Sequence, residues 1–202
     1  MKYLSIDIET TGLDPLTDQL LSFGAIIEDT ENLLPFDEIP KFHVAIKRNR
    51  IEGNLYAINM NKNLIETINL YMGTTNLDEK IGIVQKTGMN FYKEEDIVDK
   101  FRQWLRENEF IHMYDGIKNL TVAGKNFATF DKLFIERLPK WNQYFRIRQR
   151  IIDPAILYVD WKNDDSLPGL STCKTRAKLN PNVTHNAIED AWDVIEILRL
   201  NY

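Results

Sequence analysis

Two acidic residues near the start of the chain carry the clearest chemical signal in the sequence. Asp7 and Glu9 lie two positions apart in residues 3–9, a segment whose pattern predicts a β-strand. Side chains alternate between the two faces of a strand, so both carboxylates point the same way. Like charges at this spacing repel each other unless a cation lies between them. The pair therefore predicts a site for a hard divalent metal ion at the end of a strand.

Two more acids and a histidine follow in distant segments. Asp131 comes after a short apolar segment at residues 120–124 and lies at the start of a predicted helix. Asp190 comes five residues after His185, and Asn186 is the predicted N-cap of the helix that holds Asp190. His185 is then outside the helix and free to move, while Asp190 lies in the rigid first turns. A metal ligand benefits from rigidity, whereas a proton-transferring imidazole benefits from access.

These residues together predict a hydrolytic site that uses metal ions. Four carboxylates and one imidazole would form it: Asp7, Glu9, Asp131, Asp190 and His185. A cluster with only oxygen ligands suits Mg²⁺ or Mn²⁺ rather than Zn²⁺. Cys173 is the single cysteine of the chain, which excludes both an internal disulfide and a multi-cysteine zinc site.

The elements that would position these residues follow from hydrophobic periodicity. Apolar runs and alternation predict strands at residues 3–9, 20–28, 41–47, 120–124 and 150–153. Apolar stripes at helical spacing predict helices at residues 61–71, 93–108 and 128–138, within 164–179 and after Asn186. Residues 73–90 show little periodicity, and we interpret them as an insertion or excursion. The order of elements predicts a mixed α/β sheet covered by helices, in a single domain spanning residues 1–202.

The overall composition is that of a globular domain with a sizeable core. The chain has 202 residues, of which 44% are hydrophobic and 27% are charged. Its net charge of −5 gives no global sign of nucleic-acid binding, although local basic patches can still hold phosphates. No apolar run is long enough to span a membrane, and the N-terminus turns acidic before a signal peptide could form. We therefore expect a cytoplasmic protein, or one in another intracellular soluble compartment.

Three segments of the chain resemble the motifs of a known enzyme superfamily. They are Asp-Ile-Glu-Thr-Thr-Gly at residues 7–12, residues 126–131 and residues 185–190. In this order they are similar to the three motifs of the DEDD 3′–5′ exonucleases, and the His-x-x-x-x-Asp form of the third resembles the DEDDh branch. Every acidic position and the histidine are filled. The resemblance implies a ribonuclease H-like fold, with a mixed five-stranded sheet flanked by helices.

The resemblance also implies a role for each residue of the predicted site. Asp7, Glu9 and Asp190 would hold one of two divalent ions, either Mg²⁺ or Mn²⁺. Asp7 would bridge to the second ion, which Asp131 would support directly or through water. Two ions in this arrangement stabilise the attacking and leaving oxygens of a phosphodiester. His185 would act as general base, and a nucleoside 5′-monophosphate would leave the 3′ end of a single strand.

The substrate implied by the resemblance is the 3′ end of single-stranded DNA or RNA. Its terminal nucleotide would meet the backbone at Thr10 and the side chain of Leu13, and Asn126 resembles a substrate-contacting asparagine. Asn126 lies five residues before Asp131, whereas many relatives have four. The choice between DNA and RNA depends on pocket details that these motifs do not determine. Relatives differ in assembly, so a homodimer and an association with a polymerase both stay open.

Two other classes of function compete with the exonuclease reading. One is a non-catalytic nucleic-acid-binding module on the same fold, which would be expected to lose metal ligands. The other is a metal-dependent phosphohydrolase that acts on small nucleotides. Degradation of a labelled oligonucleotide, compared with a free nucleotide, separates these classes.

Several further charged residues allow more than one interpretation. Residues 140–150 interleave basic and aromatic side chains, which predicts either a grip on a single-stranded backbone or a solvated helix with inward aromatics. A second basic group is interpreted as a solvated face, with phosphate contact as the alternative: Lys174, Arg176 and Lys178. His43 and His112 are interpreted as surface-loop histidines.

Overall fold

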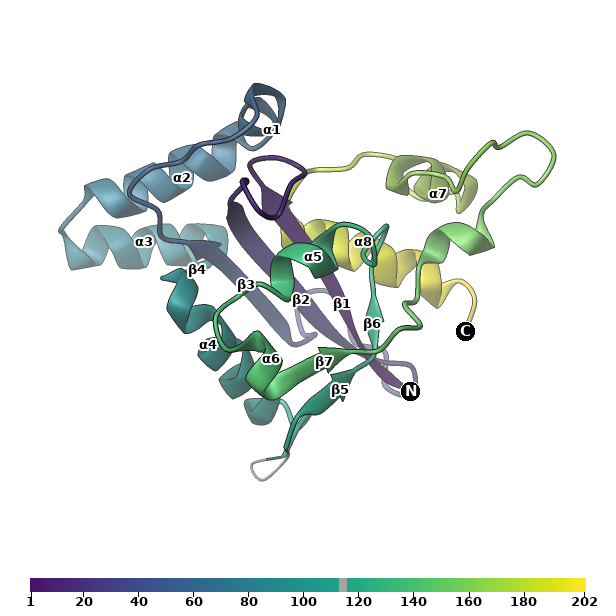
Figure 1. Cartoon of the computed structure of the whole chain (residues 1–202). Coiled ribbons are helices and arrows are strands. Elements are labelled where there is room, and N and C mark those ends of the chain that lie inside the picture. Colours follow the sequence, from purple (N-terminus) through teal and green to yellow (C-terminus); the bar gives the residue numbers. More distant parts are fainter. Residues whose placement is uncertain (113–115) are drawn as a thin grey trace.

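The centre of the molecule is a mixed sheet with helices on both faces (Figure 1). The computed structural model describes residues 1–112 and 116–202, and over these residues the main sheet has five strands in the order β4-β3-β2-β1-β6. The strands are β1 Lys2–Thr10, β2 Leu20–Asp29, β3 Lys41–Ile46, β4 Asn90–Tyr92 and β6 Val122–Ala123. Neighbours β1, β2 and β3 pair antiparallel as a meander, while β4 and β6 pair parallel to their neighbours. This architecture confirms the predicted fold class.

The central strand β1 sends its two sets of side chains to different helical layers. Leu4, Ile6 and Ile8 belong to the larger core, on the side covered by α4 (Glu94–Glu107). Ser5 points to the opposite side, where its hydroxyl donates a 2.7 Å hydrogen bond to the Ala191 carbonyl of α8 (Ala187–Arg199). Because alternate residues share a face, the odd-numbered acids of β1 point toward α8. The alternation of the first strand thus directs its carboxylates to one particular helix.

An aromatic core fills the layer beneath α4. Phe101 of α4 stacks on Trp141, with ring centroids 5.8 Å apart, and meets Phe145 edge-on at 5.5 Å. Phe23 of β2 lies 5.1 Å from the Phe101 ring. These four side chains are fully buried, and burying one large apolar side chain contributes about 1.5–3 kcal/mol. The layer therefore packs α4 and the segment that holds Trp141 and Phe145 against this face of the sheet.

Helix α8 lies against the other face of the sheet because β2 has a glycine beneath its first turn. A Cβ on Gly24 would lie 2.5 Å from the carbonyl carbon of Ala187, closer than any real contact. Asn186 caps the helix as predicted, since its side-chain oxygen accepts a 3.2 Å hydrogen bond from the Ile188 N–H. The glycine and the cap together determine where the first turns of α8 sit over β1 and β2.

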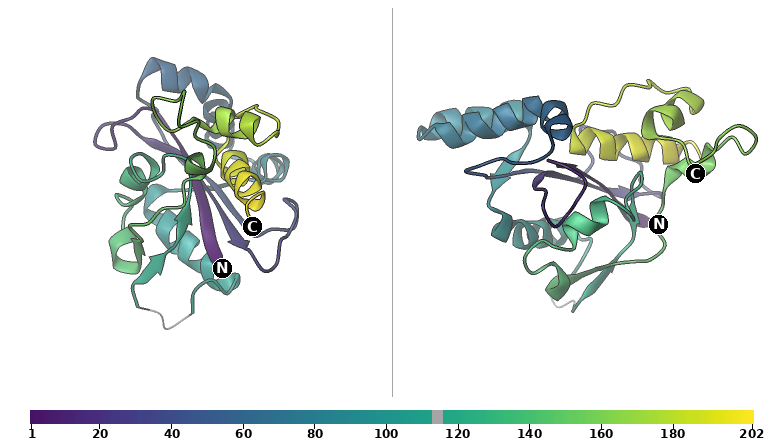
Figure 2. Two further views of the ribbon diagram at one scale, coloured as in Figure 1. Left: turned by 90° about the vertical axis from the view of Figure 1, so that its right-hand side faces the viewer. Right: turned by 45° about the horizontal axis from the view of Figure 1, so that its top comes forward.

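A helical excursion extends from the β3–β4 edge of the sheet (Figures 1 and 2). It consists of α1 Leu55–Met60, α2 Lys62–Gly73 and α3 Leu77–Thr87. Residues 73–90, where little periodicity was seen, contain the whole of α3. A satellite core under these helices includes Ile68, Met89 and Phe91, and Tyr71 stacks on Phe91 at 4.0 Å between centroids. Helix α2 agrees with the helix predicted at residues 61–71, whereas α1 and α3 were not predicted.

The later strands differ from the prediction. Residues 120–124 were predicted as one strand, but they are divided between β5 (Lys118–Leu120) and β6, which pair with different partners. β5 pairs with β7 (Phe145–Ile147) in a separate small sheet, and β6 pairs with β1. Instead of a strand at residues 150–153, only Ile152 forms a bridge, to Ala123. Two helices in this part are shorter than predicted, α5 Asp131–Ile135 and α7 Leu170–Arg176. Between them lie α6 Trp141–Tyr144 and a 3₁₀ turn Pro154–Leu157, neither of which an apolar stripe predicted.

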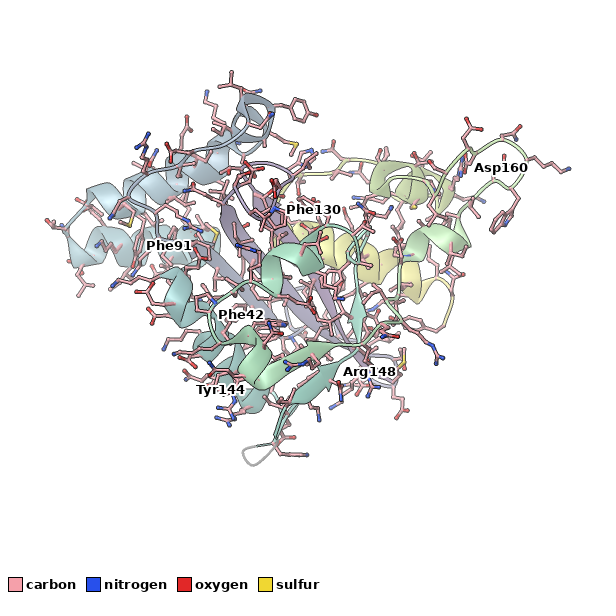
Figure 3. The ribbon with its side chains drawn as sticks, in the orientation of Figure 1. Phe42, Phe91, Phe130, Tyr144, Arg148 and Asp160 are labelled. Atoms are coloured by element: carbon pink, nitrogen blue, oxygen red, sulfur yellow. The ribbon has the colours of Figure 1, made fainter. Side chains whose placement is uncertain are left out.

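The basic and aromatic segment at residues 140–150 packs its aromatics inward. Trp141 and Phe145 are completely buried, which leaves them no face on which a base could stack. Arg146, Arg148 and Arg150 are exposed, and Figure 3 shows Arg148 close to the β5–β7 pair. The inward packing is the second of the two interpretations, although the helix covers only Trp141–Tyr144 and is followed by strand β7.

The interpretation of His43 as a surface-loop residue is wrong. His43 is buried in β3, opposite Gly24 of β2, and burial lowers its pKa to about 4. His112 is exposed, outside any helix or strand. Among the residues that the structure describes, no helix has both the length and the apolar composition needed to cross a bilayer.

Candidate active site

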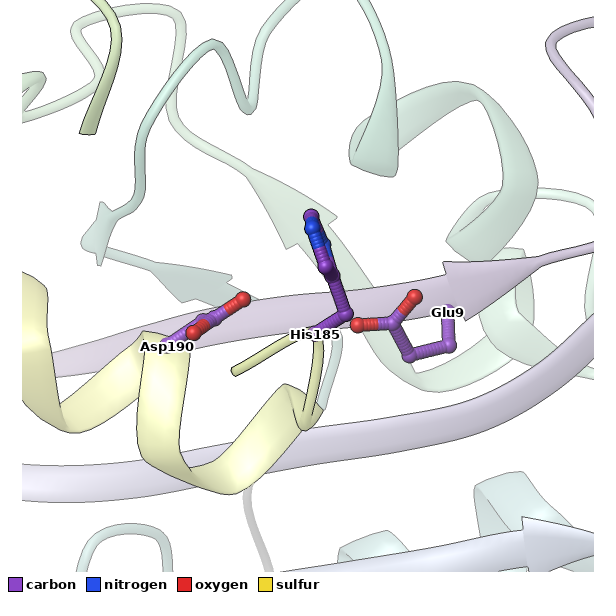
Figure 4. Close-up of side chains that lie close together, drawn as sticks. All are labelled: Glu9, His185 and Asp190. Atoms are coloured by element: carbon purple, nitrogen blue, oxygen red, sulfur yellow. The ribbon is translucent and has the colours of Figure 1, made fainter. Parts of the chain in front are cut away.

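The first and third motifs meet where β1 ends beside the start of α8. Glu9 lies near the end of β1, Asp190 lies in the first turns of α8, and His185 precedes that helix. Each residue offers one ligand atom, and these three atoms all lie within 4.8 Å of one another (Figure 4). Asp7, two residues before Glu9 on the same face of β1, lines the same cavity. The fold thus brings together residues that are up to 183 positions apart in the sequence, from Asp7 to Asp190.

Asp131 is buried beside β1. Its carboxylate accepts a 3.1 Å hydrogen bond from the Ile8 N–H, and its side chain is 3% exposed. Asp131 opens helix α5, so its own backbone N–H also supports the charge. Its negative charge acts on Asp7, but Asp131 does not line the cavity. The second motif therefore supplies a buried charge beside the pair in β1.

Burial raises the pKa of all four acids, and the charges of the other acids add to this effect at Asp7 and Glu9. Burial first, and then the charges of Asp131, Glu9 and Asp190, hold the pKa of Asp7 well above its usual value. Burial and the Asp190 charge raise the pKa of Glu9 to about 8, and burial raises that of Asp131 to about 8. Burial and Asp193 raise the pKa of Asp190 to about 6. A cation between these groups would relieve both the repulsion and the lost solvation.

One oxygen of the site supports this expectation on its own. Asp190 Oδ1 is buried, and it has no hydrogen-bond partner among the described residues. A buried carboxylate oxygen without a partner costs free energy, unless a ligand satisfies it. Asp7, Glu9 and Asp190 offer hard oxygen donors in one place, so these residues fit a divalent cation.

Asn61 is a part of the site that no motif predicted. It is 2% exposed between α1 and α2, and its amide donates a 3.1 Å hydrogen bond to the Thr10 carbonyl. Its side chain also hydrogen-bonds to Glu9, which opposes the effect of burial on the pKa of that carboxyl. Asn61 therefore holds the end of β1. The only local sequence sign was its position at the start of the predicted helix at 61–71.

His185 lies in an unusual backbone conformation. Its φ is +52°, in the left-handed region that non-glycine residues seldom adopt and that costs about 1 kcal/mol or more. The side chain is exposed at the cavity, as expected for a residue outside the helix. The exposed imidazole of His185, beside three carboxylates, can accept a proton from a water in the cavity.

A cavity of about 660 Å³ opens over the acids. Two predicted substrate residues line it: Thr10, whose hydroxyl donates to the Gly12 carbonyl at 2.7 Å, and Leu13, which is 82% exposed. Asn126 does not line it; its side-chain oxygen accepts a 2.7 Å hydrogen bond from Thr129. Asn126 also has a φ of +59°, which turns the chain before α5. The structure thus groups Thr10 and Leu13 with the acids and separates Asn126 from them.

Three apolar or aromatic residues of the cavity were missed: Tyr56, Met60 and Phe130. Tyr56 is 77% exposed in the first turn of α1, where the Asn54 side chain accepts its backbone N–H at 2.8 Å. The Asn54 N–H in turn donates to the Thr11 carbonyl at 2.8 Å, which ties α1 to the loop after β1. An amphipathic stripe could have revealed a longer helix, but α1 is too short to show one.

The interpretation of Lys174 as a solvated residue is wrong. It is 6% exposed, and its ammonium lies 2.5 Å from Asp193 Oδ2. Arg176 pairs with Asp164 through both guanidinium nitrogens, with the Nη2–Oδ1 distance at 2.7 Å. Lys178 ends the α7 region with a φ of +61°. Lys174 and Arg176 thus hold this part of the chain together rather than offering free charge to a phosphate.

One family model matches the N-terminal part of the chain. The model of the Exonuclease (RNase T) family matches residues 4–66, which include the first motif, β2, β3 and Asn61. The comparison with curated protein sequences gives no match. The match agrees with the resemblance read from the first motif.

Solved structures of E. coli exonuclease I have the same fold. The complex with a 5cy-dT13 oligonucleotide is 16% identical, with a TM-score of 0.57, over 98% of this chain and 40% of that chain. The zinc ion bound form of the complex with single-stranded DNA is 17% identical, with a TM-score of 0.58 and the same coverage. The chain therefore spans about 40% of the length of these proteins. These structures share the fold of this chain, and the Exonuclease family model matches the segment that carries the first motif.

Proposed function

We propose that the chain belongs to the DEDDh exonucleases and is a metal-dependent 3′–5′ exonuclease. It would hydrolyse phosphodiester bonds at the 3′ end of single-stranded DNA or RNA and release nucleoside 5′-monophosphates. One observation carries the proposal. Glu9, His185 and Asp190 each offer one ligand atom, these three atoms lie within 4.8 Å of one another, and the residues share a cavity with Asp7. Carboxylates beside an accessible imidazole are the groups that metal-assisted hydrolysis requires.

Two divalent ions, Mg²⁺ or Mn²⁺, are part of this proposal. Asp7, Glu9 and Asp190 would hold one ion, and Asp7 with Asp131 would hold the second. When bound, such ions supply positive charge at the attacking and leaving oxygens of the phosphate. The unpartnered Asp190 Oδ1 and the mutual repulsion of the acids support this arrangement.

The residues of the chain have distinct tasks in the reaction. His185 receives the proton of the attacking water, for which its exposed position beside Glu9 and Asp190 is suited. The Asn61 amide keeps the end of β1 in place through the Thr10 carbonyl, and so keeps Glu9 in place. The Ser5–Ala191 hydrogen bond and the close approach of Ala187 to Gly24 hold α8 against β1 and β2.

The terminal nucleotide would bind in the 660 Å³ cavity. Leu13 and Tyr56 are both largely exposed, and they offer an apolar and an aromatic surface to a base. Thr10 would meet the sugar-phosphate through its backbone. Single-stranded DNA is the first substrate to test, because the E. coli exonuclease I structures with this fold hold DNA oligonucleotides.

Trimming of single-stranded oligonucleotides tests the proposal. DNA and RNA, labelled at the 3′ or the 5′ end, would be incubated with Mn²⁺, Mg²⁺ or EDTA, and the products separated. We expect the 3′ label to leave first as a mononucleotide and the 5′ label to stay on a shortening ladder. Asp7→Ala should abolish the activity, and His185→Ala should lower it by roughly 10²- to 10⁴-fold.

Other results would separate the alternatives. Glu189→Gln, which neutralises an exposed acid next to Asp190 on α8, is the matched control and should keep its activity. Hydrolysis of a free nucleotide with an intact oligonucleotide would indicate a small-nucleotide phosphohydrolase. Binding without cleavage would indicate a non-catalytic module, and unaltered activity in Asp7→Ala would contradict the proposed site.

A further inference from the structure

A buried lysine lies behind the loop that holds His185. Lys174 of α7 is 6% exposed, and its ammonium is 2.5 Å from both Asp193 Oδ2 and the Asn182 carbonyl oxygen. Asp193 lies on α8, three residues after Asp190. The lysine thus connects α7, α8 and the segment between them through one charge. A buried ammonium needs such partners, because desolvation without them is costly.

The loop between α7 and α8 has few other anchors in its middle. Residues 180–186 have no helix or strand, and Pro181, Asn182, Thr184 and His185 are exposed. The loop begins beside Leu179, which packs near Cys173, and it ends where Asn186 caps α8. Between these ends, the Asn182 carbonyl is held by Lys174 and the Thr184 backbone hydrogen-bonds to Asp190. Both links are within three residues of His185.

We propose that Lys174 is a positioning residue for His185. Its ammonium holds the Asn182 carbonyl, and through it the loop, at a set distance from the first turns of α8 that carry Asp190. Without this link, the Thr184 backbone would be the remaining contact between the middle of the loop and α8 among the described residues, and the left-handed backbone of His185 would be free to relax. The inference rests on the proposed function, in which His185 receives a proton from the attacking water.

The ion pair and the loop link can be separated by substitution. Asp193→Asn removes the ion pair but leaves Lys174 bonded to the Asn182 carbonyl. Lys174→Met with Asp193→Leu removes both, and it replaces the buried pair by apolar side chains, an exchange that is often neutral for stability. Lys174→Met alone would leave Asp193 buried without its partner, so it serves only as a destabilised reference.

Two readouts test the role of Lys174. Hydrogen exchange of the loop amides, measured on the metal-free proteins, should be at least about 10-fold faster in the double variant, with α8 unchanged. The kcat on single-stranded DNA should fall by on the order of 10- to 100-fold, with KM and Mn²⁺ affinity near those of the wild type, because misplacement affects the chemical step. Asp193→Asn should keep both loop exchange and kcat within about threefold of the wild type.

The outcomes distinguish this inference from the proposed function. Unchanged loop exchange in a folded double variant would overturn the inference, and so would faster exchange with a wild-type kcat. Equal losses in Asp193→Asn and the double variant would assign the effect to the ion pair, which also overturns it. If the wild-type protein lacks nuclease activity while loop exchange rises as expected, the proposed function fails and the anchoring by Lys174 is retained.

Discussion

Helix α8 has buried acids beside both of its ends. The acid beside the C-terminal end is paired with an arginine, whereas the acids beside the N-terminal end face each other. At its C-terminal end, Glu28 of β2 is 0% exposed and accepts hydrogen bonds from Arg199 at 3.0 and 2.7 Å and from Tyr202 at 3.2 Å. At its N-terminal end, Glu9 and Asp190 are almost as deeply buried, but they face each other. Both ends use the same β1–β2 face, on which Tyr3 is paired with Glu28 and Glu9 with Ser22.

Glu28 stabilises the fold, whereas the acids near Asp7 belong to the candidate site. A buried acid that only stabilises the fold is surrounded by a cation and hydrogen-bond donors, as Glu28 is. The acids near Asp7 repel one another, and Asp190 Oδ1 has no partner among the described residues. Such an arrangement lowers the stability of the metal-free protein, and it is expected where a ligand supplies the missing charge.

Removing the cation at the paired end should have the largest effect on stability. Arg199→Met leaves Glu28 buried without its cation, and we expect a loss of about 3–5 kcal/mol in the free energy of unfolding. Urea denaturation measures this value. The double variant Glu28→Gln/Arg199→Met should recover most of the loss, since no unpaired charge stays buried. A loss below about 1 kcal/mol in Arg199→Met would show that the two ends do not differ as described.

The unpaired end should make the stability of the metal-free protein depend on pH. Glu9 and Asp131 have pKa values raised to about 8 in the folded protein, chiefly by burial. An acid with a raised pKa binds its proton more tightly when folded, so its cost is absent below about pH 4 and complete above about pH 8. Thermal unfolding in EDTA should show stability falling by a few kcal/mol between pH 5 and 8.

The same experiment with Mn²⁺ sharpens this prediction. Bound metal should offset the charges, so the fall in melting temperature toward pH 8 should be much smaller. A metal-free melting temperature that stays level or rises from pH 5 to pH 8 would contradict the view that the acids are unpaired.

Neutralising one acid of the cluster should stabilise the protein while removing its function. Asp7→Asn relieves the repulsion from Asp131, Glu9 and Asp190, and we expect a gain of roughly 1–3 kcal/mol in EDTA at pH 8. Glu28→Gln, at the paired end, is the matched control and should lose stability. Thermal melts of both variants provide the measurement, and a loss in Asp7→Asn would count against the account.

The aromatic rim of the cavity should have the smallest effect. Tyr56→Ala removes a surface for base stacking, so the KM for single-stranded DNA should rise about 10-fold, or about 1.4 kcal/mol. Stability should change by no more than about 0.5 kcal/mol, because Tyr56 is 77% exposed. Trp161→Ala, in which an equally exposed aromatic at 79% is removed from a loop outside the cavity, is the control. Equal changes in both variants would argue against a base at Tyr56.

The sequence predicted the central strands and the acids because their signals are local. Period-two alternation placed Asp7 and Glu9 on one face of β1, and the Asn186 cap separated His185 from Asp190. The division of residues 120–124 could not be predicted, since β5 and β6 differ in their pairing partners and not in their local pattern. Buried polar residues such as Lys174 and His43 were misread for a related reason. Their burial depends on Asp193 and Gly24, which are distant in the sequence.

The acids beside the N-terminal end of α8 are proposed to hold a divalent cation, which would also satisfy Asp190 Oδ1. Calorimetric titration of the metal-free protein with Mn²⁺ tests this claim most directly, using wild type, Asp190→Asn and Glu189→Gln. The two substitutions neutralise adjacent acids on α8, of which Asp190 faces Glu9 and Glu189 is exposed. We expect Glu189→Gln to bind Mn²⁺ like the wild type and Asp190→Asn to lose at least about 10-fold in affinity. Equal affinity in all three proteins, or no binding by the wild type, would contradict the claim.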